Sequence, residues 1–107
     1  MSTLIKYSPA AVRDLERVWN EVCSASYDYN TTLKYIDGIL ERSDSKKLFL
    51  KSGKPLYYDN SFTGYYYVIY KVYLAFYRIE ENDIIVDRIL YTKSDYLKRL
   101  GIYAESE

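Results

Sequence analysis

The sequence predicts an α+β fold, in which an N-terminal strand and a helical hairpin pack on one face of an antiparallel sheet, followed by a short C-terminal helix. Two observations lead to this prediction. Apolar residues recur at helical spacing near the N-terminus, and three runs rich in aromatic and β-branched residues follow, at Tyr65–Tyr70, Tyr73–Ile79 and Ile84–Tyr91. Because the gaps between these runs are too short for a crossover helix, neighbouring strands must be antiparallel.

The N-terminal segment is expected to form one strand and the first helix. Thr3–Tyr7 is short and rich in strand-forming residues, so we expect it at a sheet edge or beside the last strand. Ser8 can cap a helix, Pro9 suits its first position, and the apolar spacing continues the helix to about Ser24. Trp19 extends the apolar stripe, so we expect it in the core.

A second amphipathic helix is expected to begin at Thr31 or Thr32 and to end near Asp44. Together with the first helix it would form a hairpin, which is a natural cover for one face of a sheet.

A basic loop at Ser45–Pro55 connects this hairpin to the sheet, and the apolar residues 48–50 inside it are expected to anchor it to the core. A short strand at Leu56–Asp59 and a turn at Asn60–Gly64 then lead into the long strands. After the sheet we expect a helix at Asp95–Leu100, capped by Ser94 and stopped at Gly101.

Turn chemistry between the long strands is uneven. Glu81-Asn82-Asp83 is a typical turn cluster, whereas Lys71-Val72 is a poor one, because two-residue hairpins favour Asn or Gly. We still expect a hairpin at Lys71-Val72. Alternation predicts a sheet covered on one face and partly open on the other, with tyrosines on the open face. In the last strand the two predicted faces are Ile85, Asp87, Ile89 and Tyr91, and Ile84, Val86, Arg88 and Leu90.

Composition limits the function classes. With 107 residues, we expect a single domain over positions 1–107. The chain has no histidine and one cysteine, Cys23, so Ser-His and Cys-His catalysis are excluded and neither a metal site nor a cofactor is expected. The N-terminus lacks the apolar core of a signal peptide, and no apolar run is long enough to span a membrane. We therefore expect a cytoplasmic protein without a membrane partner.

Charge and tyrosine content point to a binding surface. The formal net charge is zero, yet residues 46–79 carry six basic side chains and one acidic side chain. Such a block is either ordinary solvated charge or a local basic patch. The fifteen tyrosines either pack their rings in the usual way or form a stacking surface for bases or a protein partner.

One reaction suits a chain without histidine, namely RNA cleavage by the neighbouring ribose 2′-hydroxyl. The protein then has to orient the substrate, stabilise the anionic phosphate and protonate the leaving oxygen, which Arg, Lys and Tyr can do. Each candidate can equally be a surface charge. The predicted catalytic residues are Tyr91, Lys93, Arg78 and Arg88, and the predicted RNA-binding residues are Lys51, Lys54, Lys71 and Tyr66.

Two blocks of short motifs stand at the two ends of the chain. The first is Lys6-Tyr7-Ser8-Pro9-Ala10-Ala11 followed by Asp14-Leu15. The second consists of Gly64-Tyr65, Tyr73-Leu74, Phe76-Tyr77-Arg78-Ile79, Arg88-Ile89-Leu90-Tyr91 and Asp95-Tyr96. Together, the two blocks resemble the RelE/ParE superfamily of bacterial type II toxins over about residues 4–100.

This resemblance implies a microbial-RNase-like fold and a growth-inhibiting protein that a tightly bound cognate antitoxin neutralises. RelE-like members cut mRNA in the ribosomal A site, whereas ParE-like members inhibit DNA gyrase and are not nucleases. The sequence departs from the RNA-cleaving pattern at Tyr66, Leu74 and Ser94, where relatives often carry basic residues.

Three hypotheses follow. The first, which the basic blocks favour, is a toxin that cleaves ribosome-bound mRNA as a metal-independent endoribonuclease. The second is a non-enzymatic toxin that binds DNA gyrase. The third is an attenuated relative that serves only as an antitoxin-binding module.

Overall fold

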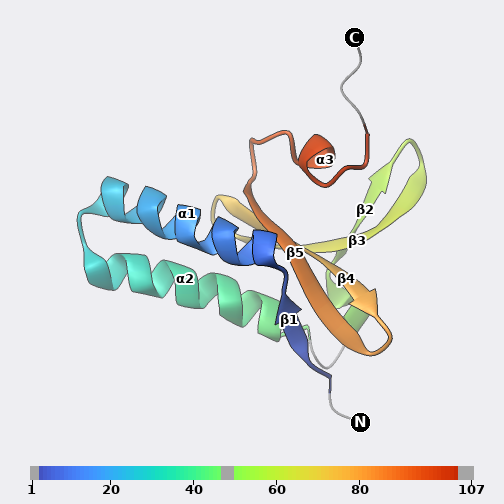
Figure 1. Cartoon of the computed structure of the whole chain (residues 1–107), viewed down its shortest axis with the longest axis horizontal. Coiled ribbons are helices and arrows are strands. Elements are labelled where there is room, and N and C mark those ends of the chain that lie inside the picture. Colours follow the sequence, from blue (N-terminus) through green and yellow to red (C-terminus); the bar gives the residue numbers. More distant parts are fainter. Residues whose placement is uncertain (1–2, 47–49, 104–107) are drawn as a thin grey trace.

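The computed structural model describes residues 3–46 and 50–103. Two long helices pack on one face of a five-stranded sheet with the strand order β1-β5-β4-β3-β2 (Figure 1), which confirms the predicted α+β class. The apolar residues 48 and 49, predicted to anchor the basic loop, lie outside the described residues. The elements are β1 (Ile5–Tyr7), α1 (Pro9–Ser26), α2 (Tyr29–Asp44), a short 3-10 turn (Leu50–Ser52), β2 (Lys54–Tyr58), β3 (Ser61–Tyr70), β4 (Tyr73–Glu80), β5 (Asp83–Tyr91) and α3 (Tyr96–Arg99).

The sheet is antiparallel except at one edge. The pairs β2–β3, β3–β4 and β4–β5 are antiparallel, as predicted from the short connections. The first strand lies at an edge beside the last one, as expected, and it pairs with β5 in parallel, with Ile5 opposite Ile84. A parallel pair is possible here because the whole helical hairpin lies between the two strands in sequence.

The connection between β2 and β3 differs from the prediction. Tyr58 pairs with Ser61, so the turn is the dipeptide Asp59-Asn60 and not a longer segment ending at Gly64. Both turn residues have positive φ, 53° and 63°, which is the geometry of a type I′ hairpin. Asp and Asn tolerate that conformation better than other non-glycine residues do, and β3 therefore extends to Ser61. The resulting long hairpin projects from the sheet (Figure 1).

The predicted hairpin at Lys71-Val72 is confirmed, because Tyr70 pairs directly with Tyr73 across it. Lys71 takes the positive φ of 53° that glycine or asparagine would normally supply. Such a residue costs on the order of 1 kcal/mol, which the surrounding sheet must offset.

The second helix begins earlier than predicted. Asp28 is its N-cap, and its carboxylate accepts hydrogen bonds from the Asn30 N–H at 3.2 Å and from the Thr31 hydroxyl at 2.6 Å. A start at Thr31 or Thr32 was therefore wrong, since Asp28, three residues before Thr31, caps the helix and satisfies its first free N–H groups. The first helix also extends two residues beyond its predicted end, to Ser26.

A β-bulge in β5 overturns the predicted faces of that strand. Arg88 lies opposite Phe76 and Val86 lies opposite Tyr77, so Asp87 is an extra residue without a partner. An extra residue inverts the alternation beyond it. Residues 84, 86 and 89 consequently all lie in the core beneath the helices, while Leu90 lies in the core on the other face.

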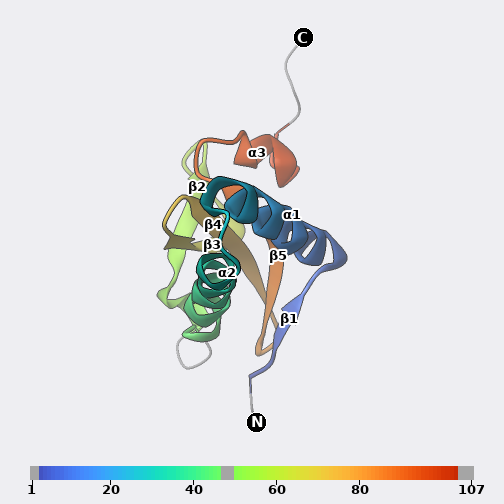
Figure 2. The ribbon, with the colours of Figure 1, turned by 90° about the vertical axis from the view of Figure 1, so that its left-hand side faces the viewer.

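Both faces of the sheet are covered, which corrects the expectation of an open tyrosine face. The larger core lies between the sheet and the helices and includes the fully buried Val18 and Ile39. Figure 2 shows the two helices, α1 and α2, side by side. The smaller core contains Leu74 and Phe76 and is covered by residues of α3 and the segment after it. Tyr65, Tyr67 and Tyr96 pack their rings against this smaller core.

The short C-terminal helix is confirmed, but its predicted cap is not. Its N-cap is Asp95, and the Ser94 hydroxyl instead donates to the Tyr91 carbonyl at 2.7 Å. Gly101 has a φ of 75°, a conformation that glycine adopts freely, and it ends the helix as expected.

Candidate functional site

The eight predicted site residues lie in three separate places in and around the sheet. Arg78 and Arg88 lie in the middle of β4 and β5, and Tyr91 lies at the end of β5. Arg78 pairs with Ile85, six residues before Tyr91. At a rise of about 3.3 Å per residue, the two side chains start about 20 Å apart along the strand. One phosphate group cannot touch both.

Arg78 is bound to carboxylates. Its Nε donates to Asp87 Oδ2 at 2.8 Å, and its Nη1 donates to Glu80. These two hydrogen bonds, that to Glu80 first, raise the pKa of the Arg78 guanidinium above its usual range. The Tyr65 hydroxyl donates to the same Asp87 oxygen at 3.1 Å. The bulge residue Asp87 therefore accepts hydrogen bonds from an arginine and a tyrosine.

The side chain of Arg88 is more buried than that of Arg78. Its Nε and Nη2 donate to the two oxygens of Asp14 at 2.7 and 3.0 Å. Asp14 lies on α1, is 3% exposed, and also accepts hydrogen bonds from Arg17 Nη1 at 2.7 Å and from the Ile89 N–H at 2.8 Å. Burial alone would raise the pKa of Asp14, but the hydrogen bonds from Arg88, Ile89 and Arg17 together outweigh it, and the net pKa is lowered.

Asp14 is a residue that sequence reasoning missed. The signal was available, because Asp14 falls at helical spacing between Ala11 and Val18, which are both fully buried. A carboxylate inside an apolar stripe needs a buried partner. Arg88, which the sequence suggested as a catalytic residue, is that partner in the structure.

Tyr91, Lys71 and Lys93 lie near the end of the sheet formed by the β3–β4 turn. The Thr92 N–H donates to the Val72 carbonyl at 2.8 Å, which brings the residues after β5 beside that turn. Tyr91 is 41% exposed, so part of this residue is open to solvent. Lys71 Nζ lies 5.8 and 5.7 Å from the ring centres of Tyr35 and Tyr70, which is a cation–π arrangement.

A buried tyrosine supports this end of the sheet. The ring of Tyr73 lies 6.2 Å from that of Tyr91, and its hydroxyl donates to Glu21 Oε1 at 2.8 Å. Burial, followed by the hydrogen bond to Glu21, raises the pKa of Tyr73. Tyr73 is therefore a structural hydrogen-bond donor that fixes the ring against which Tyr91 rests.

The remaining predicted residues lie around the start of β2. The ring of Tyr66 stacks on Tyr77 with centres 5.5 Å apart, so one of its faces is already covered. The Tyr77 hydroxyl accepts from the Gly53 N–H at 3.0 Å and donates to the Leu50 carbonyl at 2.7 Å. This tyrosine thereby holds the segment between Lys51 and Lys54 against β4.

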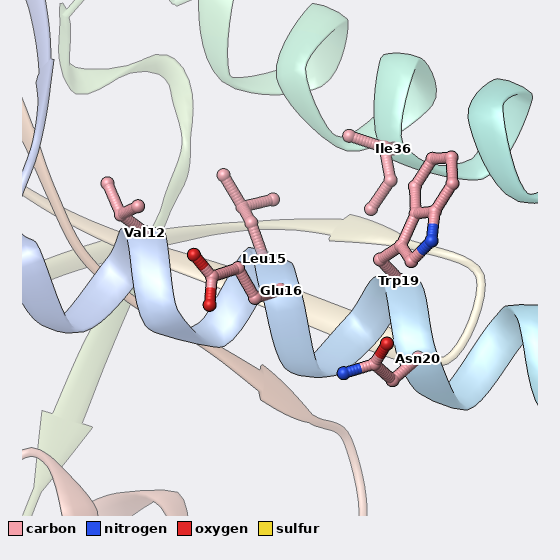
Figure 3. A pocket seen from close by; sticks show the side chains of 6 residues that line it. All are labelled: Val12, Leu15, Glu16, Trp19, Asn20 and Ile36. Atoms are coloured by element: carbon pink, nitrogen blue, oxygen red, sulfur yellow. The ribbon is translucent and has the colours of Figure 1, made fainter.

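An apolar groove on the outer side of the helical hairpin was not predicted. It has a volume of about 430 Å³ and lies between α1 and α2 (Figure 3). Trp19, predicted to be in the core, instead forms part of its wall and is half-buried, and Val12 is 46% exposed. Apolar surface of this kind is typical of a site for a protein partner. The lining residues are Val12, Leu15, Glu16, Trp19, Asn20 and Ile36.

Within residues 3–46 and 50–103, no three His, Cys, Asp or Glu side chains come together in a way that would hold a metal ion. Over the same described ranges, no helix is both long and apolar enough to cross a membrane.

Comparisons with known proteins agree on the fold. The chain resembles the chromosomal ParDE toxin–antitoxin system from P. aeruginosa, with a TM-score of 0.71 and 16% identity over 86% of this chain and 98% of that one. It also resembles the RelBE2 complex from Mycobacterium tuberculosis, with a TM-score of 0.52 and 19% identity over 85% and 92% of the two chains. The RelB–RelE complex from Methanococcus jannaschii is similar too, with a TM-score of 0.51 and 22% identity over 85% of this chain and 94% of that one. Among curated proteins, the sequence search finds no match.

The fold is therefore that of the RelE/ParE toxins, as the sequence motifs indicated. The family pattern described as the ParE toxin of the type II toxin–antitoxin system parDE matches residues 5–96. The chain belongs to this ParE toxin family.

Proposed function

We propose that this toxin inhibits growth by binding a protein target, DNA gyrase, and not by cleaving mRNA. The observation that carries this proposal is the state of the two predicted catalytic arginines. Arg78 is held by Asp87 and Glu80, and Arg88 is held by the buried Asp14.

The chemistry of 2′-hydroxyl cleavage explains why this matters. The crowded phosphate needs free positive charge beside it, and the leaving oxygen needs a proton donor within about 3 Å. Here the guanidinium charges are compensated by carboxylates, and the accessible tyrosine, Tyr91, lies several residues away along β5. The geometry thus lacks a cluster of free cations around a proton donor among the predicted catalytic residues.

The family match gives independent support. The family pattern that matches residues 5–96 is that of the ParE toxin. The resemblance stated above implies gyrase as the target of ParE-like toxins, and the neutral net charge suits a protein target better than a ribosomal one.

A supercoiling assay tests the proposal. Purified toxin added to gyrase, ATP and relaxed plasmid should inhibit supercoiling at about equimolar toxin, and the heat-denatured toxin should not. Normal supercoiling at excess folded toxin would remove gyrase as the target. Normal growth of cells that express the chain alone would instead favour a module without toxicity.

We also propose that a cognate antitoxin neutralises the toxin by laying an amphipathic helix in the groove between α1 and α2. Two features support this. The related solved structures are toxin–antitoxin systems and complexes, and the groove offers an apolar floor with Glu16 and Asn20 among its lining residues.

Replacing Trp19 by Ala tests this docking site. Because a tryptophan at the centre of a helix-binding groove contributes about 2–4 kcal/mol, antitoxin affinity should fall about 30-fold to 1,000-fold. The exposed Lys34→Ala variant on α2 serves as the control and should bind normally. Equal affinity of the Trp19→Ala variant and the wild type, by isothermal titration, would place the antitoxin elsewhere.

RNA cleavage is the second candidate, because Tyr91, Lys71 and Lys93 lie near one end of the sheet and Tyr91 is exposed. In that case, these three residues would perform the cleavage, and Arg78 and Arg88 would take no part in it.

A further inference from the structure

A second hollow lies where the end of α2 meets the start of β2 and the outer part of β3. It has a volume of about 350 Å³, and its lining includes the cationic side chains of Arg42, Lys46 and Lys54 but no acidic residue. Among residues 3–46 and 50–103, none of these three cations forms an ion pair. Like charges around one concave surface repel each other, so an anion placed there would be attracted by all three.

The last turns of α2 separate charges by sign. Glu41 and Asp44 line a different hollow, beside β1, together with Leu4 and Tyr7. The cations of the same helix end, Arg42 and Lys46, line the hollow beside β2 and β3. The positive character of this hollow is therefore not cancelled by the acidic residues that are near it in sequence.

The edge of β3 adds a backbone donor. Lys54, the first residue of β2, pairs with Tyr67, so β3 continues beyond the end of its partner. Tyr70 and Tyr73 close a two-residue hairpin and exchange hydrogen bonds, and the alternation of an antiparallel pair then turns the N–H of Ile69 away from β4. Ile69 lines the hollow, so its N–H faces the same side as the cations.

The carbonyl end of α2 would repel an anion if its oxygens were free. Two of these oxygens are already engaged, because the Ser45 N–H donates to the Glu41 carbonyl at 2.9 Å and the Lys46 N–H donates to the Ser43 carbonyl at 3.2 Å. The Ser45 hydroxyl also donates to the Arg42 carbonyl at 2.7 Å. The helix end thus opposes an anion less than an uncapped end would.

We propose that this hollow binds phosphate, in the form of the phosphodiester backbone of a nucleic acid strand. Arg42 and Lys54 are exposed and Lys46 is half-buried, so their heads can follow a strand that passes over the surface. A small free phosphate would instead require donors that enclose it. The site differs from the predicted RNA-binding set, of which it shares only Lys54, and it does not depend on which target the toxin inhibits.

Fluorescence anisotropy with the full-length chain and a labelled single-stranded DNA of about 12 nucleotides tests the proposal. The double variant Lys46→Gln/Lys54→Gln should bind about tenfold more weakly at moderate salt. Its slope of log affinity against log salt should be smaller by about 1 to 2 than that of the wild type. The control is Arg13→Gln/Lys34→Gln, which removes the same net charge from exposed positions outside the hollow and should retain most of the affinity.

Three results would overturn the proposal. The first is that the wild type does not bind the oligonucleotide. The second is that both double variants weaken binding equally, which would mean that only net charge matters. The third is that inorganic phosphate at the same phosphate concentration displaces the oligonucleotide fully, which would assign the hollow to a small phosphate. Equal urea midpoints for both double variants and the wild type would show that folding is intact.

Discussion

Two groups of cations in this toxin differ in what surrounds them. Arg78 and Arg88, in the middle of the sheet, are bound to Asp87, Glu80 and Asp14. Arg42, Lys46 and Lys54, around the hollow beside β2, have no ionic partner within the described residues. In the sequence, the residues of both groups are simply basic side chains, and nothing distinguishes the one group from the other. The difference between them shows that pairing, and not the presence of a basic side chain, separates cations that hold the fold from cations that are free to bind a ligand.

The largest effect is expected at the paired group. Asp14→Ala should lower the free energy of unfolding by about 3–5 kcal/mol, because it leaves Arg88 partly buried without its carboxylate and the Ile89 N–H without an acceptor. Urea denaturation at neutral pH measures this. Asp37→Ala, an exposed carboxylate on α2, is the control and should change stability by less than about 0.5 kcal/mol. Similar stability of the two variants would mean that the Asp14–Arg88 pair is not structural.

The same pair should make stability depend on pH. The pKa of Asp14 is lowered in the folded state from an ordinary value of 3.8, so its contribution is present above that value and is lost as the pH falls through the lower folded pKa. Urea midpoints measured from about pH 6 down to about pH 2 should therefore fall more steeply for the wild type than for Asp14→Asn. Parallel pH profiles for both proteins would contradict the assignment.

The smallest effects separate the exposed cations. Arg78 is 41% exposed in its side chain, so Arg78→Gln should cost only about 1 kcal/mol despite its two carboxylate partners. Lys46→Gln/Lys54→Gln should change stability by less than about 0.5 kcal/mol, or raise it slightly by relieving repulsion. Thermal or urea unfolding of both variants measures which of the two loses more stability. A larger loss for the lysine pair than for Arg78→Gln would reverse the distinction between the two groups.

The sequence predicted the fold well because its signals are local. Helical spacing, the Ser8-Pro9 start and the short gaps between strands each depend on neighbouring residues, and the order of elements followed from them. Two errors came from single residues. The carboxylate of Asp28 begins α2 upstream of the threonines, and the bulge at Asp87 inverts the faces of β5, which no periodic pattern can reveal.

The site was harder to predict because its geometry depends on contacts between distant residues. Arg88 and Asp14 are 74 positions apart, and nothing in the sequence specifies that they meet. The apolar groove arose because the stripe on α1 divides between two neighbours. Val18 faces the sheet, whereas Trp19 and Val12 face the space beside α2. The sequence predicted one apolar stripe on α1, whereas the helix has apolar residues toward both the sheet and α2.

Our proposal that this toxin acts on gyrase excludes RNA cleavage as the cause of growth arrest. Mapping the 5′ ends of a defined mRNA by primer extension, after incubation of programmed ribosomes with the purified toxin, tests it most directly. The same ends are expected with and without toxin, at toxin concentrations that inhibit supercoiling. New ends within codons that occupy the ribosomal A site, and that disappear with Tyr91→Phe, would contradict it.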